Sequence, residues 1–193
     1  YRINVGFSRD ANILTARMIN PFPPAFKEYG GKIIYPEGAK SALREALSNR
    51  KGGMVIFSAP TGNGKTTTLG SCINSWGGYG EALEDTNIIT LEDPIEYIYN
   101  SKESTRIIQK ELGKDFMSFD LGIKAAMREH PTHILIGELR DKETIRAAIE
   151  AGRSGHTLMS TFHCRDIAST ISRLLDNFSG SIAEGIDLIS NIS

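Results

Sequence analysis

Cysteine is scarce in this sequence, and its placement excludes two common kinds of stabilised fold. Cys72 and Cys164 are the only cysteines among the 193 residues, and neither belongs to a Cys-x-x-Cys pair. The pattern therefore indicates neither a disulfide framework nor a zinc site. Two isolated thiols fit a reducing cytoplasm.

Long runs of apolar residues or of one charge are also lacking. No apolar stretch approaches the ~20 residues that span a bilayer, and no secretory signal pattern is visible. No block of about five like charges occurs either. With a formal net charge of −1, the chain offers no overall positive field for nucleic acid or an anionic membrane.

What the chain does contain is an ordinary globular composition, with 40% hydrophobic and 23% charged residues. Its length allows one sizeable core and a fragment of a second domain. The chain begins at Tyr1, without a methionine and inside a strand-like pattern, so we expect it to be part of a longer protein.

The order of the predicted elements indicates an α/β fold. Short apolar runs predict strands, and apolar residues at helical spacing, such as Ala39, Leu43 and Leu47, predict helices. Strands are predicted over residues 1–7, 54–58, 87–92, 134–138 and 156–162, and helices over 38–49, 66–76, 119–128, 142–151 and 167–177. Such alternation is typical of a mainly parallel sheet covered on both faces, with functional groups at the carboxyl ends of its strands.

A proline-rich segment, Pro21–Pro24, separates the first strand from the rest of this pattern. Adjacent prolines end regular structure, so the segment is either an interdomain linker or a surface loop within one domain. Residues 76–80, which are rich in glycine, are predicted to form a loop.

The stretch FSAPTGNGKTTTLG, residues 57–70, resembles a phosphate-binding loop of the form G-x-x-x-x-G-K-[ST]. Gly64, Lys65 and Thr66 match its end, whereas Ala59 replaces its first glycine. Alanine is tolerable there if φ is negative, and a chance match is the alternative. The residues expected to bind ATP and its phosphates are Pro60, Thr61, Gly62, Asn63, Gly64, Lys65, Thr66 and Thr67.

Three further motifs carry candidate chemistry. LEDPIEY, from Leu91, presents Glu92 and Glu96, which could activate water, hold Mg²⁺ or form only a solvated acidic loop. ILIGELRD places Glu138 after a predicted strand, where it could face magnesium or pair with Arg140. SGHTLMSTFHC has histidines at both ends of a strand, and His163 could sense a γ-phosphate or be an ordinary surface residue.

Together these motifs resemble the type II/type IV secretion system ATPase family. The matching stretches are APTGNGKTT (Walker A), ITLEDPIEY (Asp box), ILIGELRDKETIRAAIEAG (Walker B) and GHTLMSTFH (His box). A four-cysteine zinc motif is missing and RLLDNFSG is present, which favours the PilT/DotB-like branch. The presence of Arg153 in AGRSGH departs from the family pattern.

The resemblance implies a RecA-like P-loop NTPase core with a mainly parallel sheet, preceded by the end of a smaller α+β N-terminal domain. We expect residues 1–20 to be the remnant of that domain, 21–37 the linker, and 38–193 the ATPase domain without its C-terminal helical part. It also implies a homohexamer that uses ATP and Mg²⁺ at the inner face of a bacterial inner membrane. Partner proteins there would be inner-membrane secretion or pilus platform proteins, and no direct contact with nucleic acid is expected.

The family pattern also suggests individual roles. Glu96 is the candidate for activating the attacking water, with Glu92 as the second choice, and Thr66 and Glu138 are the candidates for Mg²⁺. His163 would report the γ-phosphate. The candidates for an arginine that acts on a neighbouring site are Arg2, Arg9 and Arg17. The alternatives are a nucleotide-binding scaffold that does not hydrolyse ATP, a small-molecule P-loop kinase and a DNA translocase.

Overall fold

The computed structural model describes residues 2–9, 11–17, 20–24, 37–48, 51–74, 85–101, 104–176 and 188–191. Its main body is a six-stranded sheet in the order β5-β4-β6-β7-β3-β8, and every adjacent pair is parallel. The strands are β3 (Gly53–Ser58), β4 (Thr86–Glu92), β5 (Thr105–Glu111), β6 (His133–Ile136), β7 (Thr157–Phe162) and β8 (Leu188–Asn191).

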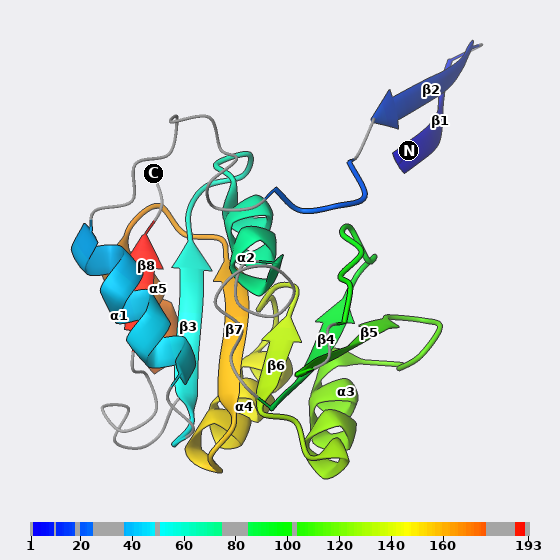
Figure 1. Cartoon of the computed structure of the whole chain (residues 1–193). Coiled ribbons are helices and arrows are strands. Elements are labelled where there is room, and N and C mark those ends of the chain that lie inside the picture. The colour runs from blue at the N-terminus through cyan, green and yellow to red at the C-terminus, as the bar shows by residue number, and fades with distance from the viewer. Residues whose placement is uncertain are drawn as a thin grey trace.

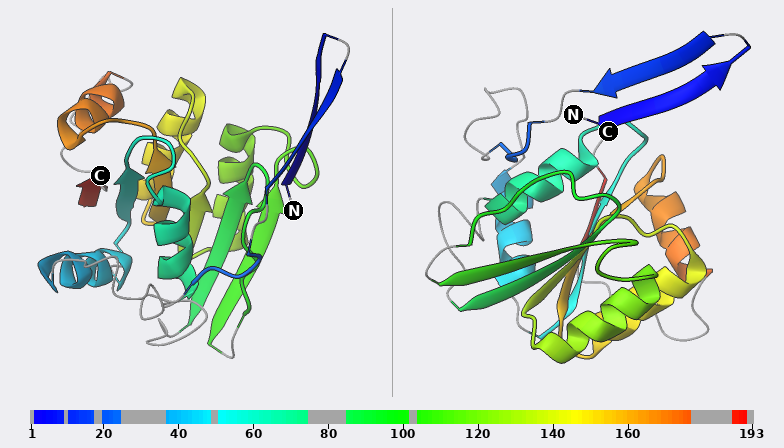
Figure 2. Two further views of the ribbon diagram at one scale, coloured as in Figure 1. Left: turned by 90° about the horizontal axis from the view of Figure 1, so that it is seen from above. Right: turned by 90° about the vertical axis from the view of Figure 1, so that its right-hand side faces the viewer.

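Helices cover both faces of this sheet (Figures 1 and 2). One face carries α1 (Glu37–Ser48) and α2 (Lys65–Ile73), and the other carries α3 (Phe119–Ala126), α4 (Lys142–Arg153) and α5 (Ile167–Leu175). The predicted α/β fold with a parallel sheet covered on both faces is therefore confirmed, and so are the five predicted helices, whose ends shift by at most three residues.

The two faces build two separate cores. Along β3, Met54 and Ile56 belong to the core under α3, α4 and α5, whereas Val55 and Phe57 belong to the core under α1 and α2. Because side chains alternate across a strand, a fully buried strand needs apolar residues at consecutive positions, as the run MVIF provides.

Two strands of the main sheet were not predicted, and both lie at its edges. β5 reads TRIIQKE, and its polar residues obscure the apolar signal on which strand prediction depends. β8 is a short edge strand beside β3. The prediction that residues 134–138 form one strand is wrong at its end, because β6 stops at Ile136 and leaves Gly137 and Glu138 in the following turn. The predicted loop at 76–80 lies outside the described residues.

The N-terminal residues form a separate antiparallel hairpin of β1 (Arg2–Ser8) and β2 (Ala11–Arg17). It projects away from the main sheet (Figures 1 and 2). The strand expected at 1–7 is thus present, and its partner β2 is an additional strand. Within the described part of the chain, no helix combines the length and apolar character needed to cross a membrane.

The proline segment between hairpin and sheet is packed against the main body rather than extended freely. The Ile98 N–H donates to the Pro21 carbonyl at 2.7 Å, and Asn74 Nδ2 donates to the Pro23 carbonyl at 2.8 Å. Pro23 is buried. The division into a remnant, a linker and an ATPase domain remains a prediction.

Candidate active site

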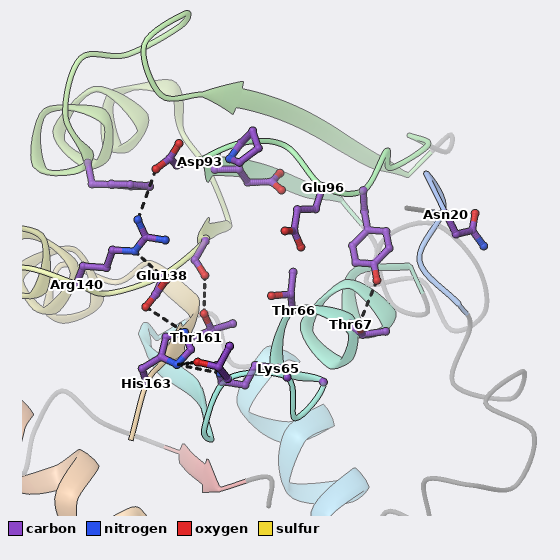
Figure 3. A pocket seen from close by; sticks show the side chains of 18 residues that line it. Asn20, Lys65, Thr66, Thr67, Asp93, Glu96, Glu138, Arg140, Thr161 and His163 are labelled. Atoms are coloured by element: carbon purple, nitrogen blue, oxygen red, sulfur yellow. Dashed lines mark hydrogen bonds and ion pairs between the residues drawn. The ribbon is translucent and has the colours of Figure 1, made fainter. Parts of the chain in front are cut away.

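A pocket of about 390 Å³ opens at the carboxyl edge of β3, β4, β6 and β7 (Figure 3). This edge is where a parallel α/β sheet places functional loops. The residues that line the pocket come from all four motifs, from the segment before Pro21 and from the start of α3: Asn20, Thr61, Gly62, Gly64, Lys65, Thr66, Thr67, Glu92, Asp93, Pro94, Glu96, Tyr97, Phe119, Gly137, Glu138, Arg140, Thr161 and His163.

The loop between β3 and α2 has the backbone that phosphate binding requires. Gly62 and Gly64 have φ of 85° and 77°, a left-handed conformation that glycine adopts without a Cβ clash. Gly64 is also the N-cap of α2, so the unpaired N–H groups of the first turn face the loop. Ala59 is buried and is not among the residues with positive φ, which is why alanine is accommodated there.

Lys65 is buried, and it folds back onto its own loop. Its Nζ donates to the carbonyls of Ala59 at 2.8 Å and Pro60 at 2.9 Å, and it lies 3.3 Å from His163 Nδ1. Burial lowers the pKa of Lys65, and the nearby carboxylate of Glu138 partly offsets this effect. These are flexible contacts to loop oxygens, which phosphate oxygens can replace.

A chain of polar contacts continues from Lys65 across the pocket (Figure 3). An ammonium group can only donate, so His163 Nδ1 accepts from Lys65 and the proton of the neutral ring lies on Nε2. His163 Nε2 lies 3.4 Å from Glu138 Oε1. His163 is thus an acceptor toward the Walker A lysine, and its other ring nitrogen faces the Walker B glutamate.

Glu138 is held from the other side by an arginine. Arg140 Nε donates to Glu138 Oε2 at 2.8 Å, and Arg140 Nη1 lies 3.6 Å from Asp93 Oδ2. The salt bridge considered as an alternative role for Glu138 is therefore present, but it lies inside the same pocket. Residues from the Walker A, Walker B, Asp and His boxes are joined in one network.

The turn that carries Glu138 is fixed by the neighbouring strands. The Gly137 N–H donates to the Leu91 carbonyl at 2.8 Å, and Thr161 Oγ1 donates to the Gly137 carbonyl at 2.7 Å. The Leu139 N–H donates to the Thr161 carbonyl at 3.1 Å. Glu138 lies after the end of β6, and hydrogen bonds at its two neighbours, Gly137 and Leu139, hold its backbone in place.

The two glutamates of the Asp box occupy different environments. Glu92 is only 6% exposed, and its Oε1 accepts from Thr90 Oγ1 at 2.7 Å and Gln109 Nε2 at 3.1 Å. Burial raises the pKa of Glu92, and these hydrogen bonds oppose the shift. Glu96 is half-buried and points across the pocket toward Thr66 (Figure 3). The geometry favours Glu96 over Glu92 as the group that meets a reactant.

Most of the predicted site residues come together, with clear exceptions. Glu92, Glu96, Glu138 and His163 all line the pocket, as do the predicted phosphate-loop residues other than Pro60 and Asn63. His156 precedes β7 at the opposite edge of the sheet from His163.

The candidate arginines lie in the hairpin, and Arg9, whose side chain the structure describes, is outside the pocket lining. Arg9 is exposed at the hairpin turn, and Arg2 and Arg17 are backbone partners at the other end. Arg153, the departure in the His-box region, is exposed at the last position of α4. It lies at the edge of the sheet opposite the pocket.

Sequence reasoning missed several residues of the site. Tyr97 donates its hydroxyl to Thr67 Oγ1 at 3.2 Å, and Thr161 holds the Walker B turn. Gln109 lies on β5, which was not predicted, so no signal pointed to it. Tyr97 belongs to the stretch LEDPIEY, where its place in the motif was the available clue.

The donor groups of the pocket suit a nucleotide bound together with Mg²⁺ better than a free metal ion. The described residues contain no group of three or more His, Cys, Asp or Glu side chains arranged to hold a metal ion. Magnesium at phosphoryl-transfer sites takes one or two protein ligands and completes its shell with phosphates and water. The left-handed glycines, the α2 N-terminus, Lys65 and Thr66 suit phosphates, so the site fits Mg²⁺ bound with a nucleotide rather than alone.

A glycine-bearing loop between a buried strand and a helix, at the carboxyl edge of a parallel sheet, defines a P-loop domain. The chain belongs to the type II/IV secretion system protein family, whose model matches residues 17–189. Within it, the chain is a member of the PilT/DotB-like branch.

Known relatives of that branch show how far the similarity extends. The twitching motility protein of Neisseria gonorrhoeae is 43% identical over 154 residues, which are 79% of this chain and 40% of that protein. The ATPase DotB of Legionella pneumophila has a similar structure, with a TM-score of 0.76 and 30% identity over 93% of this chain and 47% of that chain. The pilus retraction motor PilT with bound ADP gives a TM-score of 0.75 and 35% identity over 93% and 48%. The chain thus spans less than half of these relatives.

Proposed function

We propose that the protein binds ATP at this pocket and hydrolyses it, as a motor subunit of a secretion or pilus system. The network from Lys65 through His163, Glu138 and Arg140 to Asp93 carries this proposal. This network connects the phosphate loop to the three other motifs through hydrogen bonds and ion pairs. A site that only binds nucleotide does not need such connections. The family and the ADP-bound relative support it.

The chemistry follows from the placement of each group. The loop amides and Lys65 neutralise the phosphates. Glu96 accepts a proton from the attacking water while the water oxygen forms its bond to the γ-phosphorus. The bond to the β-phosphate oxygen breaks, leaving ADP and phosphate. Thr66 and Glu138 would hold Mg²⁺, which would neutralise charge on the phosphates. His163 connects the γ-phosphate position to Glu138.

We further propose that the working unit is a homohexamer that serves a type IV secretion, conjugation or pilus machine. It would be cytoplasmic and attached to inner-membrane platform proteins at the inner face of a bacterial membrane. The near-neutral charge argues against direct binding to nucleic acid. The exposed position of Arg9, away from the pocket of its own chain, suits an arginine that acts on a neighbouring subunit.

The experiment is a measurement of ATP hydrolysis per subunit across protein concentration, with the variants Lys65→Ala and Lys142→Ala. Lys65→Ala should lower the rate by about 10²-fold or more, because the buried donor at the phosphates is lost. Lys142→Ala removes an exposed lysine at the start of α4 and should leave the rate unchanged.

Other outcomes would replace the proposal. Nucleotide binding without hydrolysis at any concentration would make the protein a scaffold that holds nucleotide. Transfer of the phosphate to an added small-molecule acceptor would make it a kinase. Hydrolysis that depends on added DNA would favour a translocase.

A further inference from the structure

Gln109, on the edge strand β5, uses its whole amide group on the Asp box and the residues directly after it. Its Nε2 donates to Glu92 Oε1 at 3.1 Å and to the Tyr97 carbonyl at 2.8 Å. Its Oε1 accepts the Tyr99 N–H at 3.0 Å. A backbone N–H can only donate and a backbone carbonyl can only accept, so these two partners determine the orientation of the amide.

These contacts fall on both sides of Glu96 along the chain. Before it, Glu92 is buried and also accepts a hydrogen bond from the Glu96 backbone N–H. After it, the Tyr97 carbonyl and the Tyr99 N–H are both bonded to Gln109. The residue that points into the pocket is therefore flanked by two segments that one side chain holds.

The loop has little regular structure of its own to replace this support. Between β4 and β5, residues 93–101 form no helix or strand. Side chains and backbone of other elements also hold the loop: the Ile95 N–H donates to Glu111 Oε2 at 3.4 Å, again from β5, and the Ile98 N–H donates to the Pro21 carbonyl at 2.7 Å. The Tyr97 hydroxyl donates to Thr67 Oγ1 at 3.2 Å, and Asp93 lies near Arg140. Thr90 of β4 is paired in register with Gln109 of β5. The pairing of these two strands therefore places the Gln109 side-chain amide at the base of the loop.

We propose that Gln109 is a positioning residue that holds the Asp-box loop so that Glu96 faces the phosphate site. In this division of roles Glu92 is the fixed, buried acceptor at the end of β4, and Glu96 is the group that contacts the attacking water. The proposal rests on the proposed ATP hydrolysis. It assigns a function to a strand whose residues lie outside all four motifs.

The test compares Gln109→Met, which keeps the length of the side chain without its hydrogen bonds, with Arg106→Ala, an exposed position on the same strand. Gln109→Met should lower kcat by roughly tenfold to a hundredfold, because a small displacement of a reacting group has effects of that size. The Kd for ADP should stay within about twofold, since the amide makes no contact with the phosphate loop. Arg106→Ala should behave like the unchanged protein.

Hydrogen exchange supplies a readout that is independent of catalysis. In Gln109→Met the Tyr99 amide should exchange at least about tenfold faster, while the amides of β3 exchange as before. If the methionine variant does not fold, Gln109→Glu tests the donor contacts alone. It keeps the shape and the acceptor for the Tyr99 N–H, so exchange at Tyr99 should stay the same, whereas kcat should still fall because the bonds to Glu92 and to the Tyr97 carbonyl are lost.

Unchanged kcat and unchanged exchange at Tyr99 would overturn the proposal. A fall in kcat accompanied by an equal loss of ADP affinity and faster exchange in β3 would also overturn it, because it would indicate general destabilisation. If the unchanged protein binds ADP but shows no turnover, the proposed hydrolysis fails, whereas the exchange at Tyr99 still decides whether Gln109 holds the loop.

Discussion

At the scale of single residues, two buried charged side chains distinguish this pocket from the rest of the sheet. Lys65 and Glu92 are each 6% exposed and lie on different elements of the site. Burial disfavours the charged form of both, which lowers the pKa of Lys65 and raises that of Glu92. Hydrogen bonds offset the free-energy cost of burying these charges. Lys65 donates to loop carbonyls, and Glu92 accepts from Thr90 and Gln109.

The raised pKa of Glu92 predicts how stability depends on pH. Between the ordinary value of about 4.5 and its raised value, the folded state binds more protons than the unfolded state. The contribution of Glu92 to the free energy of unfolding is therefore complete below that window and falls as pH rises through it. In Glu92→Gln this dependence should vanish. The free energy of unfolding of the variant should therefore increase relative to that of the unchanged protein as pH rises.

Urea unfolding of both proteins from pH 4 to pH 8 measures this difference, and titrations common to both proteins cancel. Glu143→Gln, which removes an exposed carboxylate from α4, serves as the control. A stability difference between Glu92→Gln and the unchanged protein that stays constant over this range would contradict the prediction.

At the scale of elements, the end of the sheet opposite the pocket depends on close backbone contact. Gly52, just before β3, has φ of +89° and lies against the turn between α4 and β7. A Cβ at this position would lie 2.3 Å from the Gly152 carbonyl oxygen and 2.8 Å from the Gly155 Cα. The glycines of this region therefore serve packing rather than phosphate binding.

A pair of substitutions separates backbone strain from steric overlap. Gly155 also has a positive φ, +99°, but a Cβ there would meet nothing within 4 Å. Gly155→Ala should therefore cost about 1–3 kcal/mol from conformation alone. Gly52→Ala should cost a further 1–3 kcal/mol or so, because β3 or the turn must move. Chemical unfolding measures both values, and equal losses would show that the overlap is relieved without cost.

At the scale of the whole molecule, the hairpin and the pocket are separate parts of one chain. Among the described side chains of the hairpin, Arg9 is absent from the pocket lining, and β1 and β2 pair only with each other among the described strands. If Arg9 stabilises the transition state, it has to reach a pocket in another subunit. That requirement makes catalysis a property of the assembly.

Mixing inactive variants tests this requirement. A protein with Arg2, Arg9 and Arg17 all changed to Ala should bind nucleotide normally and lose on the order of 10³–10⁵ in hydrolysis rate. Adding subunits of Lys65→Ala, which retain the arginines, should restore part of the activity, because each variant supplies what the other lacks. Activity of the triple variant close to that of the unchanged protein would exclude the hairpin arginines.

Much of the fold was predictable because its signals are local. The buried strand β3 contains a continuous apolar run, β4 and β7 are rich in apolar and β-branched residues, and the helices between them have apolar residues at helical spacing. The edge strand β5 escaped prediction because its exposed side selects polar residues. The end of β6 was misplaced because Gly137 and Glu138 directly follow its apolar run, and no local signal shows that they form a turn, which hydrogen bonds from Gly137 to Leu91 and Thr161 hold in place.

The sequence by itself determined the order of elements, the phosphate loop and the identity of the charged groups, because each depends on residues adjacent in the chain. Only the tertiary structure decided how those groups meet. Lys65 and His163 are almost one hundred residues apart, yet parallel pairing of β3 with β7 brings them within 3.3 Å. Gln109 acquires its place beneath the Asp box from the pairing of β4 with β5. Contacts of this kind depend on the register of a sheet, which local patterns in the chain do not specify.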